Sequence, residues 1–209
     1  MRRSKADAEI TRCAILDAAA DHFAKLGINR TRLEDIAVSA GVTRGAIYWH
    51  FSDKESLIAA MIDRVSGPTE AAIAELNTIQ ESETQSLDTL KNVVTDAFNR
   101  IYNTPAAARI TSFMLRYSLS KESEWLTGRI EQARQLNLAN ISQFIERAQQ
   151  AGLLTTEYAP ECLANHIHGH IVGLLHQHLS SPPPGLSPEH VSNSMDLVLK
   201  GLSPAKKGT

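Results

Sequence analysis

Residues 29–54 constrain this chain more than any other stretch, because they read as two short helices joined by a tight turn. Apolar residues recur at helical spacing on one face of the first helix: Leu33, Ile36, Ala37 and Ala40. Gly41 follows as a left-handed residue that would end this helix. Thr31 and Thr43 precede the two helices, and their hydroxyls are predicted to cap the first backbone N–H groups. A helix-turn-helix of this kind places its second helix in the major groove of DNA.

The second helix carries a specific pattern, Thr-Arg-Gly-Ala-Ile-Tyr-Trp-His-Phe over residues 43–51, followed by Lys54 and Glu55. This pattern resembles the DNA-binding core of the TetR family of transcriptional regulators. Ile-Leu-Asp-Ala-Ala at 15–19 and Asp-Ile-Ala at 35–37 match the same family, so the resemblance covers residues 10–60. The Tyr-Trp-His-Phe form is most similar to the AcrR-type branch, whose members repress multidrug efflux genes.

The resemblance and the chemistry of the side chains together predict the residues that contact DNA. The predicted set is Thr31, Thr43, Arg44, Gly45, Tyr48, Trp49, His50 and Lys54. A guanidinium can bond to O6 and N7 of guanine, so Arg44 is the candidate base reader, with a phosphate contact as the alternative. Gly45 would let the helix approach DNA closely. Tyr48 and His50 resemble the family's backbone-contacting pair but could instead be packing residues, and Trp49 could stack on the sugar–phosphate or pack against the first helix.

Composition agrees with a protein that binds DNA through a local surface. The net charge is −2 at pH 7, which argues against coating nucleic acid through charge alone. Basic residues nevertheless gather near the motif: Arg2, Arg3, Lys5, Arg30, Arg32, Arg44 and Lys54. No apolar run is long enough to cross a membrane, and no apolar segment behind the first residues predicts a secretory signal. Cys13 and Cys162 show no metal-ligand spacing and suggest no disulfide framework, so we expect a protein of the reducing cytoplasm.

The remaining residues show helical periodicity throughout, and no segment with the period of a strand survives. The chain is therefore predicted to be all-α, with about nine helices. The resemblance implies a three-helix DNA-binding domain over residues 1–53 and a bundle for ligand binding and dimerisation over residues 54–209. Ser66-Gly67-Pro68 is predicted to kink or break the fourth helix, because proline removes a donor and clashes with the preceding turn.

The second domain is expected to hold an apolar pocket for a small amphipathic inducer. The candidate lining residues are Phe98, Tyr102, Phe113, Met114, Tyr117, Trp125, Asn137 and Phe144. The alternative is that these side chains fill a closed core.

The last two predicted helices, 160–180 and 188–201, have broad apolar faces and are expected to form a homodimer interface. The predicted interface residues are Ile167, Ile171, Leu174, Leu175, His178, Met195 and Val198. A two-fold dimer would bind a pseudo-palindromic operator in double-stranded DNA.

A second function remains open, namely a metal-sensing regulator on the same scaffold. Its basis is a run of histidines within residues 166–178: His166, His168, His170, His176 and His178. His166 and His170 lie four residues apart and share a helix face, as metal ligands can. Enzyme activity is not expected, because neither a glycine-rich phosphate loop nor a nucleophile elbow is present. The family resemblance calls for no cofactor.

Overall fold

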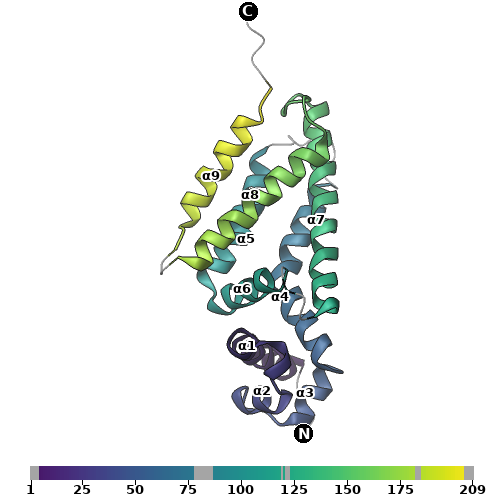
Figure 1. Cartoon of the computed structure of the whole chain (residues 1–209), viewed down its shortest axis with the longest axis vertical. Coiled ribbons are helices and arrows are strands. Elements are labelled where there is room, and N and C mark those ends of the chain that lie inside the picture. The colour runs from purple at the N-terminus through teal and green to yellow at the C-terminus, as the bar shows by residue number, and fades with distance from the viewer. Residues whose placement is uncertain (1–4, 78–86, 119, 121–122, 182–184, 205–209) are drawn as a thin grey trace, which may run out of the picture. The chain divides into compact units, whose positions relative to one another are not determined.

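The computed structural model describes residues 5–77, 87–118, 120, 123–181 and 185–204, and every regular element in these ranges is a helix. The helices are α1 (Lys5–Arg30), α2 (Leu33–Ser39), α3 (Arg44–His50), α4 (Lys54–Glu75), α5 (Leu87–Asn103), α6 (Pro105–Ser118), α7 (Glu124–Gln150), α8 (Pro160–Ser180) and α9 (Pro188–Gly201) (Figure 1). The all-α prediction is confirmed. Arg2 and Arg3 lie outside the described residues.

The chain forms two compact units, and each unit is built from two separate segments of the sequence. The first unit combines residues 1–67 with 104–116, and the second combines residues 68–103 with 117–209. Both α4 and α6 therefore run from one unit into the other. The first half of α4 belongs to the first unit because Leu57, Ile58 and Met61 are buried there. The first segment of the first unit thus ends at residue 67. The predicted division into a DNA-binding domain and a ligand-binding domain at residue 53 stays a prediction.

Local signals fix the helix-turn-helix as the sequence predicts. Gly41 has a left-handed φ of 66°, and the next residue, Val42, donates its N–H to the carbonyl of Ala37 at 2.9 Å. This is the bond that closes a helix C-terminus around a glycine. Thr43 Oγ1 accepts from the N–H of Ala46 at 3.2 Å, so Thr43 caps α3.

Thr31 does not cap α2, and that prediction is wrong. The N-cap residue of α2 is Arg32, which makes no side-chain cap bond. Thr31 is 1% exposed and donates its hydroxyl to the carbonyl of Gly27 at 2.7 Å. Gly27 has a φ of 76° inside α1, and its non-helical conformation marks a kink there. The Thr31 hydroxyl thus ties α2 to the kinked end of α1.

The fourth helix is not broken at Ser66-Gly67-Pro68. Helix α4 continues through Pro68 to Glu75, so of the two predicted alternatives the break is wrong and the kink stays a prediction. Local sequence favours a break because Pro68 cannot donate a backbone hydrogen bond. Tertiary packing on both sides overrides this preference, since Met61 and Ile62 before the proline and Ile73 and Leu76 after it are all buried.

In the second unit, α7 packs on α8 and α5 packs on α9. One apolar cluster joins these helices to the end of α4. Its largest contributions come from Phe98 on α5, Phe144 and Ile145 on α7, Ile167 on α8 and Met195 on α9. The apolar stripes of α8 and α9 thus face the core of their own protomer. No helix in the described ranges is both long and apolar enough to span a bilayer.

His178 lies on the inner side of α8, against aromatic side chains of α5. Its ring centroid is 4.8 Å from that of Phe98 and 5.7 Å from that of Tyr102. The Nδ1 atom is buried, and a hydrogen bond with the backbone of Leu186 offsets part of the effect of burial on the pKa of His178. Burial lowers the pKa of His178, and burial is also the main cause that lowers the pKa of His168 and His170. Because folding lowers the pKa of each of these histidines, the fold is most stable when the histidines are neutral.

We therefore expect the protein to lose stability as pH falls below about 6.5, the ordinary histidine pKa, because the unfolded chain then binds more protons. Urea unfolding between pH 8 and pH 5.5 measures this slope. His178→Gln should flatten it, whereas the same change at the exposed His176 should not. Glu131 has a pKa of about 2, so its ion pair is lost only at a pH below the range of this experiment. A free energy of unfolding that stays constant over the range would contradict the expectation.

Candidate nucleic-acid interface

Helix α3 has one buried and one exposed face. Ile47 is 0% exposed and anchors the helix in the first unit, and Phe51 follows it into the core. On the other face Arg44 is exposed, Tyr48 is 46% exposed and Trp49 is 73% exposed. A folded domain seldom leaves two neighbouring aromatic side chains in water unless something else covers them. The exposed face of α3 is therefore the candidate contact surface.

The Arg44 guanidinium is held by side chains from two helices. Its Nη1 lies 2.7 Å from Oε1 of Glu34 on α2, and its Nη2 donates to the Tyr48 hydroxyl at 3.2 Å. The guanidinium carbon also lies 5.5 Å from the centre of the Tyr48 ring. The Tyr48 hydrogen bond and then the Glu34 charge raise the pKa of Arg44 above its ordinary value, so the group stays charged.

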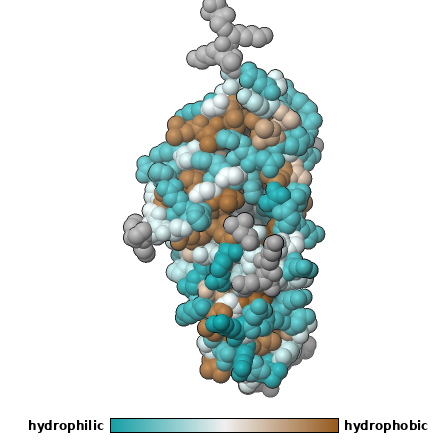
Figure 2. Space-filling view, viewed as in Figure 1, coloured by the Kyte–Doolittle hydropathy of each residue, from teal (hydrophilic) through white to brown (hydrophobic). Residues whose placement is uncertain are grey.

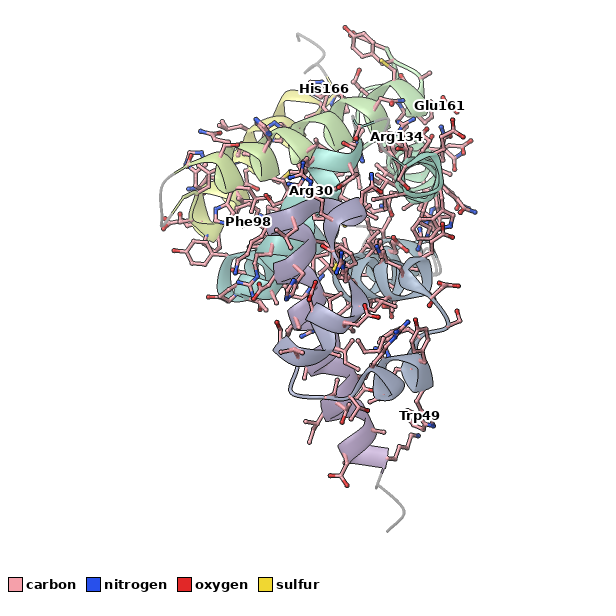
Figure 3. All side chains as sticks on the ribbon, turned by 60° about the horizontal axis from the view of Figure 1, so that its bottom comes forward. Arg30, Trp49, Phe98, Arg134, Glu161 and His166 are labelled. Atoms are coloured by element: carbon pink, nitrogen blue, oxygen red, sulfur yellow. The ribbon has the colours of Figure 1, made fainter. Side chains whose placement is uncertain are left out.

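Trp49 leaves most of its side chain in solvent, at 73% exposed. Its ring meets the His50 ring edge to face at 4.5 Å, and the side chain lies on the outside of the unit (Figure 3). His50 is half-buried between Trp49 and Phe51, and its ring centroid lies 6.0 Å from that of Phe51. Trp49 is thus free to stack on an external group, while His50 supports the aromatic rings beside it.

Gly45 is not required by the fold of the chain itself. A Cβ atom at this position would meet no atom closer than Thr43 Oγ1 at 3.9 Å. Glycine also lowers helix stability relative to alanine, so the residue is locally unfavourable. The predicted close approach of DNA to the helix backbone would account for a glycine at this position.

Gly45→Ala should therefore raise the stability of the chain and at the same time weaken its binding to DNA. The free energy of unfolding should rise by up to about 1 kcal/mol, from helix propensity. Affinity for a specific DNA site should fall about tenfold, the scale of one lost base-pair contact. Denaturant unfolding and fluorescence anisotropy measure the two quantities. Gly128→Ala on α7 is the matched control, since it also adds a methyl group in open space and should leave DNA binding unchanged. Unchanged DNA affinity in Gly45→Ala would contradict the close approach.

Two other predicted DNA contacts are engaged within the protein. The Lys54 ammonium donates to the carbonyl of Ile28 at 3.0 Å, which ties the start of α4 to the end of α1. The Thr31 hydroxyl is buried, so the prediction that Thr31 contacts DNA has lost its support. Thr43 remains exposed at the start of α3.

Sequence reasoning missed Glu34, which contacts the candidate base reader. The turn between α2 and α3 folds the chain back, so that residues ten apart meet. The spacing Glu34–Arg44 across a helix-turn-helix is the signal that could have predicted this ion pair.

Comparison with known proteins supports the same interpretation. Residues 15–61 match the family model described as bacterial regulatory proteins of the TetR family. The transcriptional repressor BepR of Brucella suis is 30% identical over 207 residues, an alignment that covers 96% of this chain and 91% of BepR. The chain belongs to the TetR family. The regulator TtgR of Pseudomonas putida is 38% identical over 114 residues, but there the chain spans about half of the relative, 53% of its length.

Solved TetR-family structures match the fold nearly from end to end. A complex of SmeT with triclosan superposes with a TM-score of 0.82 at 27% identity, covering 95% of this chain and 94% of that one. SmeT is described as the repressor of a multidrug efflux pump of Stenotrophomonas maltophilia. NalD of Pseudomonas aeruginosa, a repressor of another multidrug efflux pump, matches with a TM-score of 0.75 at 28% identity over 95% of this chain and 98% of its own.

The predicted ligand-contacting residues fall into three groups. Phe113 and Met114 belong to the first unit, where the ring of Phe113 lies 5.9 Å from that of Phe23, and their part in a ligand pocket stays a prediction. Trp125 is 36% exposed at the start of α7. The others are buried or half-buried in the second unit: Phe98, Tyr102, Tyr117, Asn137 and Phe144. Periodicity identifies the apolar face of α6 but does not say which neighbour covers it.

The predicted dimer residues face inward. Ile167, Leu174 and Met195 are at most 7% exposed and belong to the core cluster of the protomer, so placing them at an interface is wrong. Ile171, Leu175 and Val198 are half-buried and pack against the same cluster. His178 contacts Phe98 and Tyr102 instead of an outer surface. The stripes on α8 and α9 are covered by α5 and α7, which leaves the opposite faces of both helices open.

The histidines of α8 do not converge on a metal site. In the described part of the chain, no three His, Cys, Asp or Glu side chains group in a way that could hold a metal ion. His170 Nε2 is instead hydrogen-bonded to Ser194 Oγ on α9 at 3.0 Å. Glu161 and His166 lie on the same helix, more than one turn apart (Figure 3). The structure thus gives the metal-sensing alternative no support.

Proposed function

We propose that this chain is a transcriptional repressor that binds a pseudo-palindromic operator as a homodimer and leaves it when a small amphipathic ligand binds. A multidrug efflux operon is the expected target, and the cytoplasm the expected location. The exposed face of α3 carries this proposal, because it presents a fixed guanidinium and two aromatic rings to solvent on a short, well-capped helix. That BepR, SmeT and NalD are named as repressors supports it.

The proposed DNA contacts are those that the structure leaves accessible: Thr43, Arg44, Gly45, Tyr48 and Trp49. Arg44 is proposed to read a base edge, and the aromatic side chains to contact the sugar–phosphate backbone. Two such surfaces in a dimer would enter successive major grooves about 34–36 Å apart.

Selection from a random duplex pool, followed by anisotropy measurements, tests the proposal. We expect a recovered two-fold symmetric site bound with a dissociation constant on the order of 10⁻⁸ M or tighter at physiological salt. Triclosan, the molecule held by SmeT, is the first probe of release. Should selection recover no common sequence, the proposed function is wrong. Should it recover a site that no amphipathic compound of a broad panel releases, only the ligand response is wrong.

The proposed dimer surface is the outer face of α8 and α9. Gly169 and Gly173 leave open space on α8, and Leu197 on α9 is 74% exposed. Figure 2 shows apolar residues interspersed with polar ones on the face where these two helices lie. Small residues allow close approach, and an exposed leucine gains from being covered. These features suit a second copy of the chain, whose same face would meet this one across a two-fold axis.

Leu197→Arg should convert the dimer to a monomer, because it places a charge on this face in both copies. Light scattering should then give a mass near 22.9 kDa for the variant and twice that for the wild type. Leu136→Arg is the matched control, since Leu136 is also an exposed leucine of the second unit, 53% exposed on α7. A dimer that survives Leu197→Arg would place the interface elsewhere.

A further inference from the structure

Glu34 and Arg44 form an ion pair on the candidate DNA-reading surface. Glu34 belongs to the first turn of α2, and Arg44 is the first residue of α3. Their side chains meet at 2.7 Å while remaining 49% and 59% exposed. Exposed ion pairs stabilise a fold only weakly, so the stability of the chain does not explain this one. Its position next to Gly45 and Tyr48 suggests a role in binding.

The ion pair leaves the guanidinium able to bind a base. Each Nη of arginine carries two N–H groups, and Glu34 and Tyr48 engage one Nη each. One N–H on each Nη therefore stays available for the two acceptors of guanine, O6 and N7. Because Arg44 is held from two sides, less side-chain entropy is lost when it binds.

The Glu34 carboxylate also has a possible partner in the same base pair. In the major groove, the amino group N4 of cytosine is a donor and lies beside O6 of its paired guanine. A carboxylate accepts from cytosine N4, as a guanidinium donates to guanine. An Arg–Glu pair thus presents donors and acceptors in the order that a G·C pair requires.

The same carboxylate weakens binding to phosphates. A guanidinium neutralised at 2.7 Å attracts a phosphate less than a lone guanidinium does, because the phosphate also meets the negative charge. Non-specific affinity comes almost entirely from phosphate contacts. Glu34 should therefore lower affinity for random DNA more than affinity for the operator.

We propose that Glu34 is a specificity-determining residue, which with Arg44 recognises one G·C base pair in each half-site and disfavours phosphate as a ligand of Arg44. This inference rests on the proposed function. It assigns a positive role to an acidic side chain in a surface otherwise expected to be basic.

Anisotropy with full-length protein on the selected site, on its single-base-pair variants and on a random duplex tests the inference. In Glu34→Ala, the preference for G·C over the other pairs should fall about tenfold at one position per half-site. Affinity for the random duplex should rise several-fold, with a salt dependence steeper by about one phosphate equivalent. Glu34→Gln keeps an acceptor for Arg44 and should retain part of the preference while also binding random DNA more tightly.

Asp35→Asn is the matched control. Asp35 is the next residue of α2, is also exposed, and forms no ion pair with Arg44 among the described contacts. It should leave the base preference unchanged. In an Arg44→Ala background, Glu34→Ala should no longer alter preference at that position. If Glu34→Ala preserves every base preference, or changes affinity for all sequences by the same factor as Asp35→Asn, the inference is wrong. A wild type that selects no sequence refutes the proposed function instead.

Discussion

Phe113→Ala should destabilise the first unit by about 3–5 kcal/mol, the usual cost of removing a buried phenyl ring. Phe113 is 2% exposed and packs on Phe23 of α1. Two arginines of α6 hold the same helix in place. Arg116 donates to the carbonyls of Phe23 at 2.9 Å and Ala24 at 3.3 Å, and Arg109 forms an ion pair with Asp21. Loss of the ring would thus loosen the unit that carries α3.

Thermal unfolding and DNA affinity should both report this change. We expect a lower midpoint for Phe113→Ala and weaker operator binding at temperatures where the unit is partly unfolded. Phe144→Ala is a useful comparison, because Phe144 is an equally buried phenylalanine in the core of the second unit. If Phe113→Ala leaves stability unchanged but reduces affinity for the inducer, the ring lines a ligand pocket after all.

Replacing both Gly67 and Pro68 with alanine should stabilise α4 by up to about 4 kcal/mol. Glycine and proline in a helix interior are less favourable than alanine by about 1 and 3 kcal/mol respectively. The helix is already continuous, and a Cβ at Gly67 meets nothing within 4 Å, so neither alanine needs the backbone to move. Gly128→Ala, the equivalent single change in α7, should stabilise by about 1 kcal/mol.

The double variant also tests how ligand binding is transmitted to DNA. Coupling requires two states of the protein that ligand and DNA favour differently. We propose that α4 bends at this weak point when the inducer binds. A stiffer helix should then need more inducer to release DNA, while inducer affinity without DNA changes little. Induction identical to the wild type would show that the weak point of α4 does not act as a hinge.

The helix-turn-helix could be predicted in detail because its determinants are local. Thr43, Gly41 and the spacing of Ile36 and Ile47 each act through neighbours within one or two turns. The starts of α8 and α9 are local for the same reason, because a proline, Pro160 or Pro188, suits the first turn of each helix.

The errors arose where a distant segment decides the outcome. Thr31 bonds to Gly27 because α1 kinks beneath it. The inward faces of α8 and α9 and the continuity of α4 likewise depend on which helices cover them. An apolar stripe looks the same in sequence whether it faces its own core or a partner.

The discontinuous make-up of the first unit limits how these proteins can be recombined. A chimera joined at residue 53, or even at residue 67, would take α1–α3 from one parent and Phe113, Arg109 and Arg116 from the other. The carbonyls of Phe23 and Ala24 would then meet an unmatched α6. Exchange of DNA specificity between relatives should therefore succeed only when residues 104–116 travel with the N-terminal segment, or when substitutions stay on the exposed face of α3.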